Sequence, residues 1–210
     1  MKKYIFTSII ALTMLVSCDD HVQIDESWHS WYPGMVLTTD GSVLSPKEYL
    51  HSGKEIESVI FYIDHAQIMT QGIAYAVDIR EYNTNYADSL FSMGTSCDIN
   101  ALDGEQNTYI LRNLDKPSPV ATRATSPFFI PSAAEMKLLF AAKDSVNHTL
   151  SMCDLDSIPS TAWFWTSTEV ADQQLDRAYI VSMVSGQAQP EDKFFSHAVR
   201  PIRRLIYETR

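Results

Sequence analysis

The chain has 210 residues, of which 45% are hydrophobic and 11% aromatic, and its formal net charge is −10. This composition excludes a disordered protein, because disordered chains lack the apolar residues needed to fill a core. The acidic excess excludes nucleic acid as a partner, since too little positive charge is available to neutralise phosphates.

The first seventeen residues have the three parts of a secretory signal peptide. Lys2 and Lys3 form the positive region, and the mostly apolar residues 4–15 form the hydrophobic region. Leu15-Val16-Ser17-Cys18 then fits the lipobox, in which a small residue precedes the cysteine that is lipidated. The apolar stretch is shorter than the ~20 residues that a transmembrane helix needs. We therefore predict that residues 1–17 are removed and that lipid on Cys18 anchors the protein to a membrane.

The residues after the cysteine bear on the location of the mature protein. Asp19 and Asp20 follow Cys18 directly. In proteobacteria an aspartate there tends to retain a lipoprotein at the inner membrane, whereas in the Bacteroidetes acidic residues there resemble a surface-export signal. We expect an outer-membrane lipid anchor, with surface exposure as the favoured arrangement. Cleavage leaves 193 residues with a net charge of −12, enough for one domain with a full core.

Taken in chain order, residues 18–32 are polar and predict a tether, and a domain is expected over residues 33–210. Residues 35–37 and 43–44 are apolar and flank Asp40-Gly41, which is typical of a β-hairpin, and a turn is expected over residues 45–48. Residues 58–63 and 72–77 predict buried strands.

The polar stretch over residues 81–123 predicts loops. Ser132 and Glu135 then form a capping box that opens a helix. Three further strands are expected, over residues 163–168, 178–184 and 194–206. Because strands and helices interleave without regular βαβ alternation, the pattern favours an α+β fold.

Several short motifs resemble the DUF1566 family and its Bacteroidetes relatives. The matching segments are Ile130-Pro131-Ser132-Ala133-Ala134-Glu135-Met136, Trp163-Phe164-Trp165-Thr166-Ser167-Thr168-Glu169, His197-Ala198-Val199-Arg200-Pro201-Ile202-Arg203 and, upstream, Asp103-Gly104-Glu105-Gln106-Asn107-Thr108. The resemblance implies a C-type-lectin-like fold, shared with the formylglycine-generating enzymes, with mixed and antiparallel sheets, few helices and long loops. It identifies a scaffold and no activity.

The sequence carries no catalytic signature that we can assign. Formylglycine-generating enzymes use reactive cysteines near the C-terminus, where this chain has none. It also lacks a Gly-x-Ser-x-Gly elbow, a Gly-rich phosphate loop and paired histidines four residues apart. We therefore expect no enzyme activity and no obligatory cofactor.

Two further kinds of site are candidates. Cys97 and Cys153 remain after Cys18 is lipidated, and in an oxidising compartment they form a candidate disulfide; the alternative is two separate buried thiols. A cluster of oxygen ligands is also present and could bind calcium, although a solvated acidic loop explains it as well. It comprises Asp98, Asn100, Asp103 and Glu105.

The expected function is recognition of a glycan or a surface protein by a non-catalytic lectin-like domain. Contacts are expected in the long loops, over residues 81–128 and 169–193. The tryptophans are candidates for stacking on a sugar, although core packing is the favoured use of Trp163 and Trp165. The alternative is a structural or accessory subunit of a pilus or envelope assembly, which exposed edge strands would favour. A formylglycine-generating type of enzyme comes third.

Overall fold

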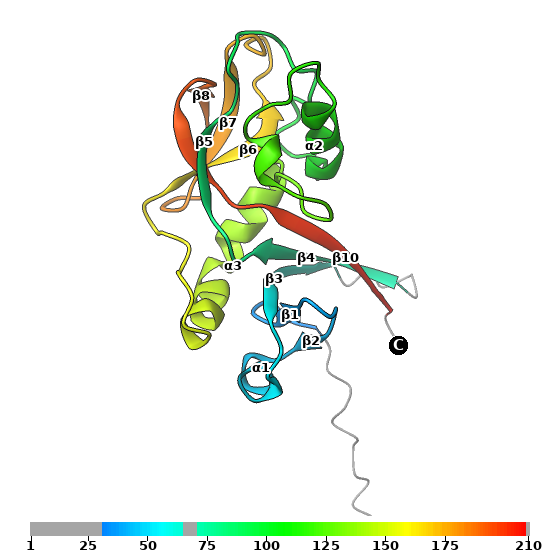
Figure 1. The fold of residues 1–210 in the computed structure, drawn as a ribbon. Helices are drawn as coiled ribbons and strands as arrows, with labels where there is room; N and C mark the ends of the chain where they lie inside the picture. The colour runs from blue at the N-terminus through cyan, green and yellow to red at the C-terminus, as the bar shows by residue number, and fades with distance from the viewer. Residues whose placement is uncertain (1–30, 65–70, 209–210) are drawn as a thin grey trace, which may run out of the picture. The chain divides into compact units, whose positions relative to one another are not determined.

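The computed structural model describes residues 31–64 and 71–208, which contain two five-stranded sheets and three α-helices (Figure 1). The strands are β1 (Val36–Thr38), β2 (Val43–Leu44), β3 (Ile56–Asp64), β4 (Gln71–Asp78), β5 (Tyr82–Asn85), β6 (Trp163–Glu169), β7 (Arg177–Ser182), β8 (Ala188–Asp192), β9 (Ser196–Val199) and β10 (Ile202–Glu208). The helices are α1 (Pro46–Ser52), α2 (Gly104–Arg112) and α3 (Ala133–Met152), with a 3-10 turn at Ala121–Arg123.

The predicted signal peptide, the lipidation site Cys18 and the tether up to residue 30 lie outside the described residues. Within the described part of the chain, no helix is both long and apolar enough to cross a membrane. The compact unit begins at Trp31, two residues earlier than expected, because the Trp31 ring stacks on Tyr207 of β10 with a centroid separation of 4.8 Å.

The first sheet has the strand order β10-β4-β3-β1-β2 and is antiparallel throughout. Its predicted hairpin is confirmed, since β1 and β2 pair across a turn in which Gly41 has a φ of +85°. That conformation favours glycine. The Thr38 hydroxyl also donates to the Asp40 carboxylate at 2.6 Å, which fixes the turn. The predicted strands over residues 58–63 and 72–77 are the central pair, β3 and β4.

The second sheet has the order β5-β9-β6-β7-β8, and it is mixed because β6 runs parallel to β9. The prediction of one strand over residues 194–206 is wrong. The chain instead divides at Arg200-Pro201, so that β9 belongs to the second sheet and β10 to the first. The carbonyl of Pro201 accepts a hydrogen bond from the Asp78 amide, which begins the pairing of β10 with β4.

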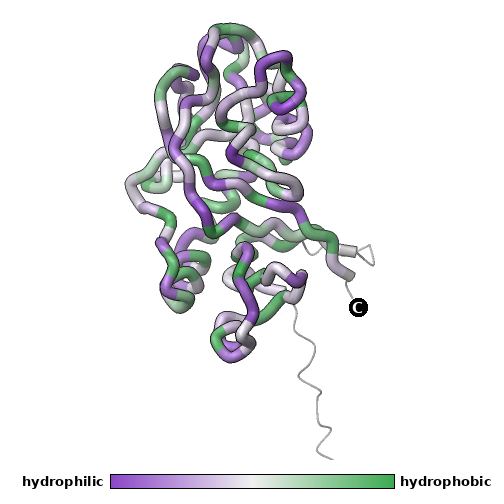
Figure 2. The backbone as a smooth tube through the Cα atoms, in the orientation of Figure 1, coloured by the Kyte–Doolittle hydropathy of each residue, from purple (hydrophilic) through white to green (hydrophobic). Residues whose placement is uncertain are grey.

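Helix α3 fills the core between the two sheets. It begins as predicted, because the Ser132 hydroxyl accepts from the Glu135 amide and the Glu135 carboxylate accepts from the Ser132 amide at 2.7 Å. The apolar side of the helix packs into one cluster with β3 and β6. Its members include Met136, Leu139, Val146, Leu150, Val59, Phe61 and Phe164. Figure 2 shows hydrophobic and hydrophilic residues interspersed along the backbone.

Two helices were not predicted. Helix α1 occupies the expected turn after residue 45, where Ser45 and Glu48 form a second capping box and Pro46 stands at the helix start. Helix α2 lies in the expected loop region and contributes Leu111 to a second core cluster around Trp165. With these additions the fold is α+β with few helices and long connections, as the sequence predicted.

Candidate functional site

The four oxygen ligands predicted to bind calcium are engaged separately. The Asp98 carboxylate accepts from the Asn100 backbone amide at 2.9 Å, and the Asp103 carboxylate accepts from the Asn107 side chain at 2.8 Å. Glu105 forms an ion pair with Arg204 at 3.0 Å. Among the described residues, no group of three His, Cys, Asp or Glu side chains is placed to hold a metal ion. This arrangement does not favour the calcium site, which stays a prediction.

The structure does not favour the candidate disulfide between Cys97 and Cys153, because both are free thiols in it, and the pairing stays a prediction. Cys97 follows Thr95 in the loop beside β6, and its sulfur lies 4.0 Å from the Thr95 carbonyl oxygen. Cys153 instead caps the C-terminal end of α3 and packs against the core cluster between the two sheets. Burial raises the pKa of both thiols, so both are held in the protonated, less reactive form.

We expect alkylation of the unfolded, unreduced protein to modify both thiols. Iodoacetamide in denaturant, followed by mass spectrometry of the peptides, should label Cys97 and Cys153 fully without a reductant. In the native protein, labelling should be slow, because burial keeps both thiols protonated. Labelling only after reduction would instead show that the two cysteines are oxidised.

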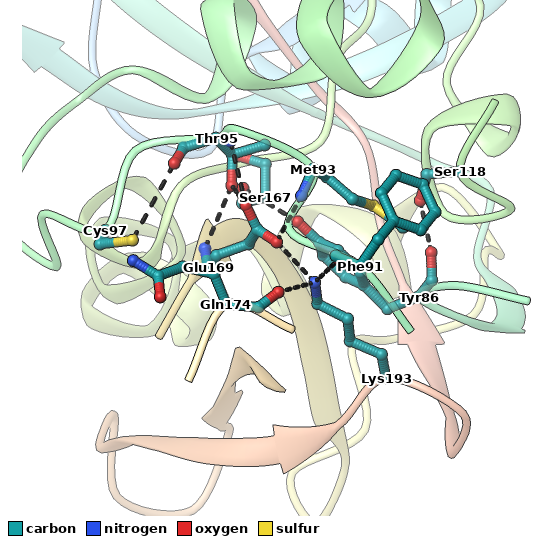
Figure 3. A network of polar contacts seen from close by, with 10 residues as sticks. All are labelled: Tyr86, Phe91, Met93, Thr95, Cys97, Ser118, Ser167, Glu169, Gln174 and Lys193. Atoms are coloured by element: carbon teal, nitrogen blue, oxygen red, sulfur yellow. Dashed lines mark hydrogen bonds and ion pairs between the residues drawn. The ribbon is translucent and has the colours of Figure 1, made fainter. Parts of the chain in front are cut away.

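The long loops expected to form the contact region are joined by a buried ion pair (Figure 3). The Lys193 ammonium lies 2.5 Å from the Glu169 carboxylate, and both side chains are 0% exposed. The same carboxylate accepts from the Met93 amide at 2.9 Å and from the Thr95 amide at 3.1 Å. A buried charge is tolerated only when it is paired and hydrogen-bonded, and here both conditions hold.

The ammonium completes its own hydrogen bonding with backbone oxygens from two other segments. Lys193 donates to the Phe91 carbonyl at 3.0 Å and to the Gln174 carbonyl at 2.5 Å, and it lies over the Tyr86 ring at 5.5 Å from the centroid. The pair therefore connects residues 86–95, the end of β6, the turn after it and the segment between β8 and β9. Because neither charged group is exposed, the network fixes these loops and presents no charge to solvent.

A groove open to solvent lies between α2 and β10, and we call it the β10 groove. It consists of two adjoining hollows of about 470 Å³ and about 330 Å³. Both hollows are lined by Glu105 and Tyr109 of α2, by Phe129 and by Arg204 of β10. In Figure 1, α2 and β10 lie on the same side of the molecule.

The two hollows of the β10 groove differ in chemistry. Asp103, Glu105 and Glu135 bring three carboxylates to the larger hollow, where Arg204 is the only basic side chain in its lining. The smaller hollow is lined by rings and aliphatic groups from Phe128, Pro127 and Ile206, with Arg112 at one side. The groove therefore offers an acidic, aromatic compartment next to one in which apolar groups lie beside charged side chains.

Glu135 is the buried member of the acidic hollow. Burial raises the pKa of its carboxyl group to about 7, although hydrogen bonds from the Ser132 and Gly104 backbones oppose the rise. A Cβ on Gly104 would lie 2.2 Å from the Glu135 carboxylate, so only glycine lets α2 begin this close to α3. The Asp103-Gly104 and Ser132 to Glu135 motifs, far apart in the sequence, thus meet at one point.

The sequence matches no family model and no curated protein. Among solved structures it is similar to a fimbrial protein from Bacteroides ovatus ATCC 8483, with a TM-score of 0.63 at 15% sequence identity. The likeness covers 82% of this chain and 48% of the fimbrial protein. The chain shares its fold with that protein. It spans about half of the fimbrial protein's length, so the two structures are alike over only part of the fimbrial protein.

The resemblance to the DUF1566 family is not confirmed by a family model. Its motifs nevertheless have clear structural roles in this fold. The segment ending at Glu135 opens α3, Trp165 is fully buried in the second core cluster, and Arg200-Pro201 is where the chain passes between sheets. These motifs therefore mark packing positions, and Glu135 also lines the larger hollow of the β10 groove.

Proposed function

We propose that the protein is a structural or accessory subunit of a fimbria or related envelope assembly, held at the cell envelope by lipid on Cys18. The observation that supports this function is the likeness to a fimbrial protein over 82% of the chain. The buried Lys193–Glu169 pair fixes the long connections of the domain, which suits a subunit that keeps one shape within an assembly.

The lectin-like alternative has less support from the site geometry. Trp165, a candidate for stacking on a sugar, is fully buried as its favoured use in core packing requires, and its indole nitrogen donates to the Thr84 carbonyl at 3.0 Å. It is therefore unavailable to a glycan. The two loop regions expected to contact a ligand are also joined to each other through Glu169 and Lys193. We further propose that the role is non-catalytic.

The proposal is tested in the bacterium that produces the protein. Surface filaments are sheared from cells, and the protein is located on them by immunogold electron microscopy. We expect the protein in the filament fraction, and we expect filament number or length to change when its gene is deleted. A protein that stays monomeric, with filaments unchanged by the deletion, would refute the assembly role.

A Cys18→Ala variant separates anchoring from assembly. We expect it to lose metabolic labelling with a fatty acid, since Cys18 is the predicted lipid acceptor. If the protein holds filaments to the envelope, this variant should release them into the medium while leaving them assembled. Filaments that remain attached to cells of the variant would rule out lipid-mediated anchoring by this subunit.

A further inference from the structure

Strand β10 is an edge of the first sheet, and its pairing with β4 shows which backbone groups are free. The Asp78 amide donates to the Pro201 carbonyl, which therefore faces β4. In the antiparallel register, the backbone groups of every second residue after Pro201, such as Arg203 and Leu205, also face β4. Ile202, Arg204 and Ile206 therefore direct their backbone groups outward. The outward groups of Ile202 are used, because Ile202 and Phe129 exchange hydrogen bonds at 2.8 and 2.9 Å.

That bridge is isolated, and the pairing does not continue along β10. Within the described residues, no strand pairs with the outer edge of β10 beyond Ile202, and neither the Arg204 nor the Ile206 backbone takes part in an outward hydrogen bond. Strand β8, an edge of the second sheet, is different, because it carries Pro190, which cannot donate a hydrogen bond to a further strand. An edge without such protection is a template for another strand.

The open edge borders the β10 groove, and exposed apolar side chains surround both. Ile206 is 66% exposed and Tyr109 is 64% exposed, although both are large hydrophobic residues. The C-terminal part of β10 is correspondingly hydrophobic in Figure 2. Free backbone groups, a groove for side chains and exposed apolar residues thus occur at one place.

We propose that the outer edge of β10 binds an extended segment of a neighbouring subunit, which adds to the first sheet as a further strand. This inference rests on the proposed function and names the surface through which the assembly forms. In strand addition, main-chain hydrogen bonds provide affinity, and pockets for alternate side chains provide specificity. The backbone groups of Arg204 and Ile206 serve the first purpose, and the two hollows of the groove serve the second.

The groove also defines the chemistry of the incoming segment. In its acidic hollow Glu105 pairs with Arg204 and Glu135 is buried, so Asp103 supplies the charge that Arg204 does not balance. Tyr75, Tyr109 and Phe129 border the same hollow, which suits a lysine or arginine side chain. In the adjoining hollow an apolar side chain can pack on Phe128 and Ile206, because the Arg112 guanidinium beside them already donates to backbone carbonyls. Side chains two positions apart on a strand lie on one face, about 7 Å from each other. The segment therefore carries a basic and an apolar residue at alternate positions.

The test uses the full-length lipidated protein in detergent and short synthetic strand peptides. One peptide carries lysine and leucine two positions apart, a second has glutamate in place of the lysine, and a third is the lysine peptide with N-methylated amides on the edge-facing side. Binding is measured by fluorescence anisotropy, and hydrogen exchange of residues 202–208 locates the bound peptide. We expect saturable binding of the lysine peptide with protection of β10, and binding at least about tenfold weaker for the other two.

Matched variants test the same edge from the protein side. Ile206→Pro removes an outward amide and no bond to β4, so we expect about tenfold weaker binding of the lysine peptide. Ile206→Val keeps the amide and should bind like the wild type. Because the N-methylated peptide tests the unmodified protein, the result stands even if Ile206→Pro folds poorly.

Three results would overturn the inference. They are the absence of binding by any peptide, equal binding of the lysine and glutamate peptides, and binding that N-methylation leaves unchanged.

Concentration-dependent dimers in analytical ultracentrifugation, abolished by Ile206→Pro, would show that a second copy occupies the edge instead. If peptides bind but the protein is absent from filaments, the strand-binding edge stands and the assembly function fails. If the protein is found in filaments that form normally with Ile206→Pro, the assembly function stands and the strand-binding edge fails.

Discussion

Replacing Lys193 with methionine is expected to lower the free energy of unfolding by about 3–5 kcal/mol, the cost of removing one partner from a buried ion pair. Methionine matches the length of the lysine stem but leaves the Glu169 carboxylate uncompensated in a site that is 0% exposed. It also leaves the Phe91 and Gln174 carbonyls without their donor. Urea denaturation of the wild type and the variant, monitored by circular dichroism, measures the difference.

Lys54→Met is the matched control, because Lys54 forms an ion pair of similar length with Asp40, at 2.9 Å, but with both side chains exposed. Exposed pairs contribute between zero and about 1 kcal/mol, so this variant should unfold almost like the wild type. The double variant Lys193→Met/Glu169→Gln should recover part of the loss, since no buried charge then remains unpaired. Equal effects of Lys193→Met and Lys54→Met would contradict the structural role given to the buried pair.

The parts of the fold that the sequence predicted are those specified by local interactions. The capping box at Ser132 and Glu135 uses side chains three residues apart, and the hairpin at Asp40-Gly41 depends on a conformation that glycine favours. Strands β3 and β4 were found because their residues are continuously apolar, as buried strands require. Such signals need no knowledge of distant contacts.

The elements that were missed depend on tertiary contacts. Helix α2 has a polar sequence, and it packs closely because Gly104 accommodates the Glu135 carboxylate from a segment thirty-one residues later. Strand β8 contains Pro190 and acidic residues, which local patterns assign to a loop, yet it pairs with β7 as an edge. The division between β9 and β10 is likewise invisible locally, because both halves are suitable strands that join different sheets.

The candidate sites show the same distinction. The Lys193–Glu169 pair joins residues twenty-four positions apart, and each looks like a surface charge in the sequence. The open edge of β10 follows from strand order alone, which no motif in the chain specifies. Conversely, the oxygen-rich residues 98–105 were conspicuous in the sequence, but their side chains are taken up by a turn, a helix start and an ion pair. Proximity in sequence therefore suggested a metal site that the side-chain contacts do not favour.

The carboxyl group of Glu135 should make stability depend on pH in the direction opposite to an ordinary salt-bridged acid. Burial raises its folded-state pKa from 4.5 to about 7, so between these values the folded protein holds a proton that the unfolded chain has released. Its contribution to stability is thus fully present below about pH 4.5 and is lost as the pH rises through about 7. At about 1.4 kcal/mol per pKa unit, the loss reaches roughly 3 kcal/mol.

A Glu135→Gln variant isolates this effect. Glutamine keeps an oxygen that accepts from the Ser132 amide, so the capping box survives, but it carries no ionisable group. Urea denaturation across pH 4.5 to 8 should show the variant gaining up to roughly 3 kcal/mol relative to the wild type as the pH rises. Glu105→Gln, at an exposed position of the same groove, controls for the general repulsion among acidic residues and should follow the wild type. Parallel pH profiles for Glu135→Gln and the wild type would show that Glu135 titrates alike in the folded and unfolded states, and that the close approach of α2 to α3 does not depend on its protonation.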